Sequence, residues 1–547
     1  MKRLVRTAAW LVVCGAVIVG ASRTAESQST PCLVSTNGGS VQGLDRGGSC
    51  AFLGIPFAAP PVNALRWRAP QPAPAWAPAT LMAGTAPPAC AQLNAANGLS
   101  TGVEDCLMLN VWTPQPLPAG APVIVWIHGG SFVNASANFP GQNGQNLAAL
   151  TGAIVVAPNY RLGPFGFLGH SALAAEGGAV GNFGLLDQRA ALAWIRDNIA
   201  AFGGDAGNVT LAGQSAGAHS VSLHLVSPGS SGLFHRAIME SGTASFRWRT
   251  TVEAATQGAA FAAALGCSGL DVAETLTCLR SKSSTDVVLA LPPPLTEQFA
   301  ETGRTQWTPV VDGVEIPGQP RALYEAGAFT RVPTLLGVNR DEGWTFVNRT
   351  FASTLSADQY EAAVSQEFGS VADAILAAYP AAAFATPKDA LATLVGDAEY
   401  LCEARRVARA LERTNTPVYV YSFEREVDPV VLDRVVHGME VNFVFGNNFG
   451  PPLFPNHTLT GDDLVLSRAM SGYWSRLAAT GRPNIDDPNV VHWPAFKTPS
   501  GRGKGSEKYL VLTAPIVEGL RFGGERCDTW DSLFLRSISG AVPASTL

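Results

Sequence analysis

A serine between two glycines is the part of this sequence with the clearest chemical potential. The run is Gly213-Gln214-Ser215-Ala216-Gly217, with a strand-like stretch at 209–211 before it and a helix-like stretch at 219–225 after it. Serine attacks a carbonyl only when a base takes its proton, and a strand-turn-helix context raises its hydroxyl above a sheet. The pattern alone is common by chance in a chain with 56 glycines. Its context predicts that Ser215 is a nucleophile in a tight elbow.

A second glycine-rich run could supply hydrogen-bond donors to the oxyanion that such an attack creates. His128-Gly129-Gly130-Ser131-Phe132 follows the apolar stretch 123–127. Glycines let the backbone approach a substrate closely, so the amides of Gly129 and Gly130 could point at one oxygen. The amide of Ala216, just after the nucleophile, would be a third donor. The alternative is an ordinary glycine turn, but two motifs in the expected order favour an oxyanion hole.

Several β-branched runs with helical patterns between them would position these residues. The runs are 123–127, 154–156, 209–211, 334–338 and 418–423, and the clearest helical pattern starts at Asp187 and stops at Gly203-Gly204. Strands that alternate with helices, and that are apolar on both faces, predict an α/β fold with a mostly parallel sheet covered by helices on both sides. In such sheets the chemistry lies at the carboxyl ends of the strands.

The residues alone do not fix the base or its acidic partner. Asp341 and Glu342 follow a strand-like run, and either carboxylate could orient an imidazole. Three histidines come later, His437, His457 and His492, and the expected order of serine, acid and histidine admits all three. His457 among Pro and Asn, and His492 beside a tryptophan, resemble surface or packing residues. His437 at a glycine turn is the better base.

The composition indicates a large, folded, mildly acidic protein. The chain has 547 residues, a formal net charge of -6, 47% hydrophobic residues and 15% charged residues. This apolar content supplies a large core, and the low charge excludes a disordered chain. The mild acidity, without a long basic run, argues against a nucleic-acid partner. We expect residues 26–547 to form one catalytic domain.

The N-terminus predicts an export signal at residues 1–21, with cleavage after Ala21 or a few residues later. Lys2, Arg3 and Arg6 precede an apolar stretch, 8–21, that is too short to span a bilayer comfortably. An uncleaved membrane anchor and a lipoprotein with a lipidated Cys14 are the weaker alternatives. No later segment resembles a membrane span, so the mature protein is expected to be secreted or periplasmic.

Eight of the nine cysteines lie beyond the signal, and an even number in an exported chain predicts disulfides. Their spacing suggests three short loops and one long one: Cys32/Cys50, Cys90/Cys106, Cys267/Cys278 and Cys402/Cys527. Spacing does not prove this connectivity, and free buried thiols are the alternative. No cysteine and histidine cluster suggests a zinc site.

Further motifs along almost the whole mature chain carry a family resemblance. They are Phe52-Leu53-Gly54-Ile55-Pro56-Phe57, Glu104-Asp105-Cys106-Leu107-Met108-Leu109-Asn110, Asn159-Tyr160-Arg161-Leu162, Gly181-Asn182-Phe183-Gly184-Leu185-Leu186-Asp187-Gln188 and Phe202-Gly203-Gly204-Asp205. Together with the elbow they resemble the type-B carboxylesterases, the α/β-hydrolase family that includes cholinesterases and bacterial para-nitrobenzyl esterases. The resemblance implies an α/β-hydrolase fold and ester hydrolysis.

The resemblance also implies roles for individual residues. The family's acid is the glutamate before glycine in a segment like 337–343, which is Glu342, and its histidine lies in a segment like His437-Gly438-Met439-Glu440. Ser241 resembles a position that supports this histidine, although a packing serine at a strand end is an equal alternative. The family pairs Cys90–Cys106, Cys267–Cys278 and Cys402–Cys527. The Cys32–Cys50 pair rests on spacing alone.

The substrate is less defined than the reaction. Cholinesterases carry a tryptophan in the first disulfide loop that binds quaternary ammonium by cation–π contact, whereas the span between Cys90 and Cys106 holds no aromatic residue. Choline esters are therefore not the first expectation. Phe132, Phe165 and Phe167 follow strand ends and either line the substrate gorge or belong to the core.

The sequence thus predicts a secreted serine carboxylesterase that acts on a small-molecule ester through an acyl-enzyme on Ser215. An amidase or carbamate hydrolase with the same triad is the main alternative, and a non-catalytic binding protein of the same fold is the weaker one. No metal or organic cofactor is implied. The oligomeric state and the acyl chain length are not visible in the sequence.

Overall fold

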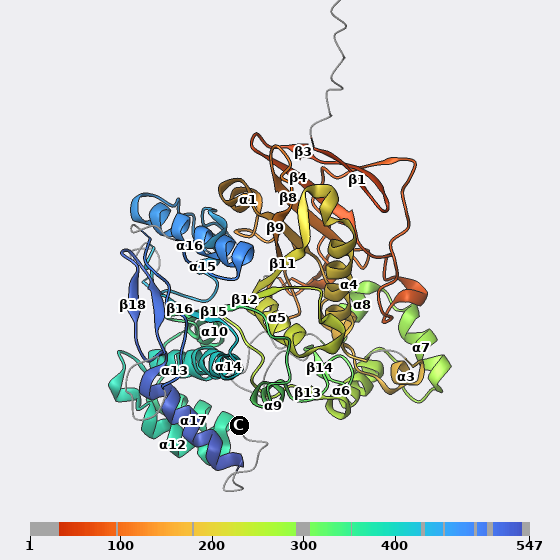
Figure 1. Ribbon diagram of the computed structural model, residues 1–547. Coiled ribbons are helices and arrows are strands. Elements are labelled where there is room, and N and C mark those ends of the chain that lie inside the picture. The colour runs from red at the N-terminus through yellow and green to blue at the C-terminus, as the bar shows by residue number, and fades with distance from the viewer. Residues whose placement is uncertain are drawn as a thin grey trace, which may run out of the picture.

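The fold is organised around one large twisted sheet with helices on both faces (Figure 1). The computed structural model describes residues 32–94, 97–177, 180–291, 307–351, 353–427, 433–451, 454–485, 490–499 and 507–538, with side chains as far as residue 533. The predicted signal, residues 1–21, lies outside the described residues.

Eleven strands form the main sheet within the described part of the chain. In spatial order they are β18 (Val517–Gly519), β17 (Tyr509–Leu512), β16 (Val418–Phe423), β15 (Thr334–Asn339), β12 (Arg236–Glu240), β11 (Gly204–Gln214), β9 (Ala121–Ile127), β10 (Ile154–Pro158), β8 (Met108–Pro114), β4 (Ser49–Pro56) and β3 (Leu44–Asp45). The strands from β10 to β17 run parallel, and antiparallel strands close both edges. The predicted mostly parallel sheet is confirmed.

Alternate residues of each central strand pack into different hydrophobic layers. In β9, Val123, Val125 and Ile127 join one layer, and Ile124 and Trp126 join the other. Helices α4, α5 and α14 cover the first layer, and helices α1, α15 and α16 cover the second (Figure 1). Because both faces are buried, these strands are apolar without a break, which is how they are recognised in the sequence.

The helices are α1 (Gln145–Thr151), α2 (Gly163–Phe167), α3 (Ser171–Ala175), α4 (Phe183–Asn198), α5 (Ala216–Val226), α6 (Thr251–Ala264), α7 (Val272–Ser281), α8 (Ser284–Leu289), α9 (Pro320–Glu325), α10 (Trp344–Thr350), α11 (Ala357–Phe368), α12 (Ala372–Ala378), α13 (Pro387–Gly396), α14 (Cys402–Arg413), α15 (Glu440–Phe445), α16 (Gly461–Thr480) and α17 (Gly524–Ile538). The helix expected from Asp187 begins earlier, at Phe183, and its last turn is a 3₁₀ turn that ends at Gly203.

Three small sheets and a third apolar cluster complete the fold. The small sheets pair β1 (Leu33–Thr36), β2 (Gly39–Gln42) and β5 (Thr80–Met82), then β6 (Gln92–Leu93) with β7 (Ser100–Thr101), and β13 (Arg249–Thr250) with β14 (Val310–Val311). The third cluster joins helices α10 to α13 with α17, below the sheet in Figure 1. This helical part also contributes residues beside the catalytic candidates.

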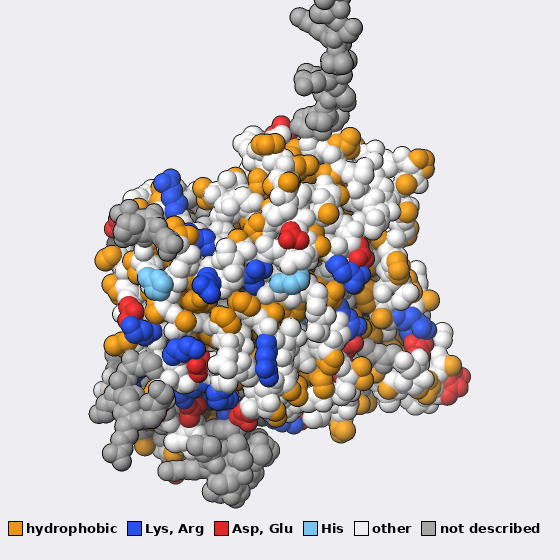
Figure 2. Space-filling model, in the orientation of Figure 1, with side chains coloured by type: hydrophobic (Ala, Val, Ile, Leu, Met, Phe, Trp, Pro, Cys, Tyr) orange, Lys and Arg blue, Asp and Glu red, His pale blue; other side chains and the backbone are white. Residues whose placement is uncertain are grey.

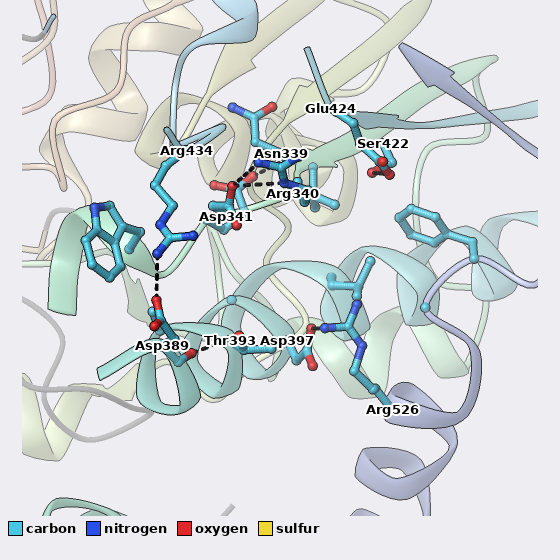
Figure 3. A pocket seen from close by; sticks show the side chains of 18 of the residues that line it. Asn339, Arg340, Asp341, Asp389, Thr393, Asp397, Ser422, Glu424, Arg434 and Arg526 are labelled. Atoms are coloured by element: carbon cyan, nitrogen blue, oxygen red, sulfur yellow. Dashed lines mark hydrogen bonds and ion pairs between the residues drawn. The ribbon is translucent and has the colours of Figure 1, made fainter. Parts of the chain in front are cut away.

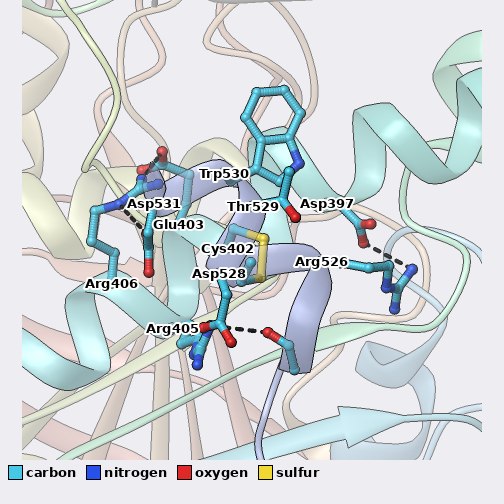
Figure 4. Close-up of a disulfide and its surroundings, with 12 residues drawn as sticks. Asp397, Cys402, Glu403, Arg405, Arg406, Arg526, Asp528, Thr529, Trp530 and Asp531 are labelled. Carbon is cyan, nitrogen blue, oxygen red and sulfur yellow. Dashed lines mark hydrogen bonds and ion pairs between the residues drawn. A yellow bond between two sulfur atoms is a disulfide. The ribbon is translucent and has the colours of Figure 1, made fainter. Parts of the chain in front are cut away.

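Four disulfides lie within the described residues: Cys32–Cys50, Cys90–Cys106, Cys267–Cys278 and Cys402–Cys527. The last one spans 125 residues and joins α14 to α17. Figure 4 shows Cys402 beside an ion pair between the same two helices, Arg405–Asp528 at 2.7 Å. Covalent and ionic links therefore hold the C-terminal helix against the body of the fold.

The surface carries charges of both signs. On the face shown in Figure 2, basic and acidic side chains are interspersed among apolar and neutral polar groups. Such mixing agrees with the small formal net charge of -6. Within the described residues, the length and apolarity needed to cross a bilayer are not reached by any helix.

Candidate active site

Ser215 lies in the turn between β11 and α5, where the backbone is held in an unusual conformation. Its φ of 57° and ψ of -126° are strained for a residue with a side chain. The Ser215 amide donates to Glu240 O at 2.9 Å, and the His219 amide donates to Ser215 O at 2.9 Å. Neighbouring elements thus fix the turn on both sides, and Ser215 is partly exposed at its tip.

The flanking glycines make this turn sterically possible. A Cβ atom on Gly217 would lie 2.0 Å from Ile127 O, and one on Gly213 would lie 2.6 Å from the Gly217 carbonyl carbon. Both contacts involve backbone atoms, which cannot move aside without disturbing β9 or α5. Glycine is therefore required at these two positions, because three backbone segments pack closely together there.

The predicted oxyanion loop meets the nucleophile directly. A Cβ atom on Gly129 would lie 3.0 Å from Ser215 Cβ, and one on Gly130, where φ is +100°, would lie 2.2 Å from Asn134 O. Among the described residues, none accepts a hydrogen bond from the amides of Gly129, Gly130 or Ala216. The loop therefore presents backbone donors beside the serine, as an oxyanion hole requires.

His128 fixes the orientation of this loop. Its ring nitrogen Nδ1 lies 2.8 Å from Gly129 O, and the ring stacks on Tyr160 with centroids 4.4 Å apart. Burial lowers the pKa of His128 to about 4, so the ring is neutral at ordinary pH and Nδ1 donates to the carbonyl. Because the carbonyl and the next amide of a trans peptide point in opposite directions, this bond turns the Gly130 amide away from His128.

Glu342 and His437 form a short hydrogen-bonded pair. His437 Nδ1 lies 2.5 Å from Glu342 Oε2, and Glu342 Oε1 accepts from the Asn339 amide at 2.7 Å. The Glu342 side chain is 2% exposed and that of His437 is 11% exposed. Since the carboxylate can only accept, Nδ1 carries the hydrogen, and Nε2 of the neutral ring has the lone pair that a base needs.

Asp341, the competing carboxylate, has a different task. Its Oδ2 accepts from the Val435 amide at 2.8 Å, and its own amide donates to Val435 O at 2.9 Å. Asp341 and Val436 also form an isolated parallel β-bridge. Glu342 follows Asp341, and His437 follows Val436, so the bridge places the side chains of Glu342 and His437 next to each other.

The hydroxyl of Ser215 is not hydrogen-bonded to any described residue. His437 Nε2 instead has the side-chain nitrogen of Gln214 3.1 Å away. Catalytic hydrogen bonds are often loose without substrate and tighten when it binds. The structure therefore bonds Glu342 to His437 and places Gln214, the residue before Ser215, in contact with the same imidazole. The other late histidines lie elsewhere: His457 bonds Asp463 at 3.2 Å, and His492 is exposed.

Comparisons with known proteins show which family the chain belongs to. A family model described as the carboxylesterase family matches residues 30–530. An acetylcholinesterase from Bungarus fasciatus is 36% identical over 552 aligned positions, which cover 93% of this chain and 87% of that protein. The chain belongs to the carboxylesterase family. It is accordingly an α/β-hydrolase and a carboxylic ester hydrolase.

Two further carboxylates, Glu240 and Glu440, lie buried in this carboxylesterase close to the Glu342–His437 pair. Glu440 accepts from Ser241 Oγ at 3.1 Å and from Asn339 Nδ2 at 2.5 Å, and Glu240 accepts from Trp474 Nε1 at 2.6 Å. Burial, and then the nearby charge of Glu342, raise the pKa of Glu440 to about 7. Burial and Glu440 raise the pKa of Glu240 well above its ordinary value. Both shifts favour the protonated form of these two carboxyl groups, Glu240 and Glu440.

Ser241 thus has a polar partner rather than a packing role alone. Its hydroxyl donates to Glu440, three residues after His437. Sequence reasoning proposed Ser241 as a support but missed Glu240 and Glu440 as a buried pair. Glu440 was visible in the His-Gly-Met-Glu motif, and Glu240 directly precedes Ser241, but only the fold shows that both are buried together.

Two aromatic rings pack against His437 of the carboxylesterase. The ring centroids of Phe346 and Tyr400 lie 5.1 Å and 5.0 Å from that of His437. Tyr400 reaches it from a π-helical turn, Asp397–Leu401, and such turns often occur at functional sites. These rings can stabilise the imidazolium through their π faces. Neither residue was predicted from the sequence, where no motif marks them.

Phe132, Phe165 and Phe167 are all buried, at 3%, 3% and 0% exposure. Their burial favours the core alternative for Phe165 and Phe167. Phe132 packs edge-on against Trp248, with centroids 6.0 Å apart, directly after the oxyanion loop. Phe132 and Trp248 therefore form an aromatic contact at the end of the oxyanion loop.

A polar cavity of about 280 Å³ has Glu342 among its lining residues. Figure 3 shows side chains of its wall, among them Asp389, Asp397 and Arg434. Ion pairs line it, among them Arg434–Asp389 at 2.8 Å, Arg526–Asp397 at 3.1 Å and Arg340–Asp341 at 3.0 Å. These acids of the cavity wall are thus paired with arginines, and the Arg434–Asp389 pair joins the segment before His437 to α13. Within the described residues, no cluster of metal-ligating side chains is found.

Proposed function

We propose that this carboxylesterase is a secreted serine hydrolase that cleaves uncharged small-molecule esters. Ser215 is the nucleophile, His437 the general base and acid, and Glu342 the residue that orients the imidazole. The amides of Gly129, Gly130 and Ala216 form the oxyanion hole. The observation that supports this most is the 2.5 Å bond between His437 Nδ1 and Glu342 Oε2 beside the strained elbow of Ser215.

The reaction follows from these positions. His437 Nε2 takes the Ser215 proton while Oγ attacks the ester carbonyl, and the electrons of the C=O bond move to its oxygen. The three amides stabilise that oxyanion, and removal of one such donor typically lowers kcat by about 10²–10³-fold. The imidazolium then protonates the leaving alcohol, and water releases the acid from the acyl-enzyme by the same route. Glu342 stays ionised throughout.

A neutral substrate is favoured by the segment closed by Cys90–Cys106. This segment contains no aromatic residue that could hold a quaternary ammonium group. Gln92 fastens it to the chain after the oxyanion loop, through bonds of 2.9 Å in each direction with Ala135. We expect choline esters to be poor substrates compared with uncharged esters of similar size.

Secretion and the domain boundary are part of the same proposal. The four disulfides suit an oxidising compartment, and the predicted signal precedes them in the sequence. Residues 26–547 then form a single catalytic domain. Mass spectrometry of the exported protein would locate the cleavage site, and a mature protein that retains residues 1–21 would contradict this part.

The first experiment compares the wild type with Ser215→Ala on short para-nitrophenyl esters. We expect wild-type hydrolysis to decline as pH falls and His437 becomes protonated, and the variant to lose about 10³–10⁶-fold in kcat. Ser365→Ala, at an exposed serine on α11 outside the candidate site, is the matched control. Persistent activity in Ser215→Ala would show that another residue is the nucleophile.

The same preparation separates the ester and amide alternatives. A matched anilide and a choline ester are assayed beside the para-nitrophenyl ester. Faster cleavage of the anilide would favour an amidase, and a strong preference for the choline ester would contradict the neutral-substrate proposal. A folded wild type that is inactive on all of them would exclude a generalist esterase.

A further inference from the structure

The side chain of Gln214 contacts the triad at the atom that must receive the proton. Gln214 is the last residue of β11 and only 6% exposed. Its Nε2 lies 3.1 Å from His437 Nε2, across 223 residues of sequence. The turn that carries Ser215 therefore places the carboxamide of the preceding residue against the imidazole.

The direction of this hydrogen bond follows from the other side of the ring. His437 Nδ1 carries a hydrogen because it faces the Glu342 carboxylate at 2.5 Å. In the neutral ring Nε2 can then only accept, and an amide nitrogen can only donate. The Gln214 amide thus donates to neutral His437. Protonation of Nε2 would set two donors against each other and break this bond.

Glycines leave room for the carboxamide on both sides. A Cβ atom on Gly129 would lie 3.1 Å from Gln214 Oε1, and one on Gly438, where φ is +84°, would lie 3.5 Å from Gln214 Nε2. The carboxamide therefore lies between the oxyanion loop and the loop of the catalytic histidine. The terminal torsion of glutamine is broad and roughly two-fold, so a half-turn exchanges its nitrogen and oxygen at little cost.

We propose that Gln214 is a positioning residue whose carboxamide reverses with the charge of His437. Its N–H donates to the neutral imidazole before attack, and its C=O accepts from the Nε2–H of the imidazolium afterwards. The amide exchanges no proton: the proton moves from Ser215 Oγ to His437 Nε2, and from there to the leaving alcohol. The proposal rests on the triad roles given above.

Two variants with side chains of similar size test the two proposed hydrogen bonds, the one to the neutral imidazole and the one from the imidazolium. Gln214→Met removes both hydrogen bonds, and Gln214→Glu can only accept and adds a negative charge. The measurement is kcat/KM for a neutral para-nitrophenyl ester against pH, whose acid limb reports the ionisation of His437 in the free enzyme. Gln71→Glu, at an exposed position, adds the same charge away from the site and is the control.

We expect the acid limb of Gln214→Met to move down by about half a pH unit, because the lost bond to the imidazolium is the stronger of the two. Its kcat should fall about 3- to 10-fold. The limb of Gln214→Glu should move up by about 1–3 pH units, while that of Gln71→Glu stays in place. An upward shift in Gln214→Met would show that the amide only donates, and unchanged limbs in both variants would overturn the proposal.

A second readout, NMR of the wild-type protein, does not depend on catalytic turnover. In wild type labelled with nitrogen-15 glutamine, the Gln214 side-chain amide resonance should titrate with the midpoint of the His437 ring, and it is assigned by its absence in Gln214→Glu or Gln214→Met. An amide that does not respond while the ring titrates would refute reversal. An inactive wild type with a responsive amide would instead count against the proposed function alone.

Discussion

Two adjacent carboxylates, Asp341 and Glu342, show how neighbouring side chains of the same chemistry take different tasks. Glu342 contacts the imidazole, whereas Asp341 holds the backbone of the histidine loop through Val435. The residues alone left the choice between them open, because both follow the same strand. The β-bridge between Asp341 and Val436 explains why the second carboxylate, and not the first, reaches the ring.

This division of labour predicts unequal effects of neutralising the two acids. Glu342→Gln should lower kcat by about 10³–10⁴-fold, since the amide no longer holds the tautomer or stabilises the imidazolium. Asp341→Asn keeps an oxygen that can accept from the Val435 amide, so its kcat should stay within about 10-fold of wild type. Steady-state assays of both variants on one ester give the comparison. Equal losses would mean that Asp341 shares the catalytic task.

Single residues were predicted from the sequence where a local motif marks them. Ser215 and Gly129 belong to such motifs, and His437 was separated from the other histidines by family resemblance. Phe346 and the Gln214 side chain were not predicted as neighbours of His437, because their contacts join segments far apart in the chain. Contacts of this kind depend on the packing of several elements and leave no periodic signal.

At the scale of elements, the turn from β11 into α5 is constrained by β9 beside it. Gly217, the second residue of α5, lies so close to Ile127 that no side chain fits at this position. The strand cores were predicted within a few residues, and 418–423 matches β16. β11 is longer than the predicted 209–211, since it starts at Gly204 through an irregular pairing with β9 that hydrophobic patterning does not reveal.

A methyl group at position 217 should therefore disturb fold and activity together. Gly217→Ala places a Cβ about where Ile127 O already lies, and such overpacking typically costs about 1–3 kcal/mol or more. We expect a lower thermal midpoint and loss of esterase activity, measured by calorimetry and para-nitrophenyl ester assay. Gly318→Ala, whose nearest contacts would be 3.8 Å, is the control and should behave like wild type.

At the scale of the whole molecule, the disulfides differ in how much chain they restrain. Cys267–Cys278 closes 11 residues, whereas Cys402–Cys527 closes 125 and fastens the last helix. The export signal and cysteine count predicted bridges, and the family resemblance paired three of them. The Cys32–Cys50 bridge, inferred from spacing alone, is present in the structure as well.

The long bridge should contribute more to stability than the short one. Chain-entropy arguments give about 5 kcal/mol for the Cys402–Cys527 loop and about 3 kcal/mol for the Cys267–Cys278 loop. The paired variants Cys402→Ala/Cys527→Ala and Cys267→Ala/Cys278→Ala should both melt below wild type, and the first at the lower temperature. Scans at one heating rate make the comparison, and the reverse order would show that native packing outweighs loop length.

The triad is drawn from the ends of β11 and β15 and from the loop after β16, so the base lies 222 residues beyond the nucleophile. During translation, a chain that has emerged as far as α5 carries its serine but neither its acid nor its histidine. We therefore expect a nascent or truncated chain of this length to be inactive toward esters. In refolding from denaturant, hydrolysis should likewise return only when the segments that carry Glu342 and His437 have packed against the turn at Ser215, so a colorimetric ester assay would report the docking of segments that are far apart in the sequence.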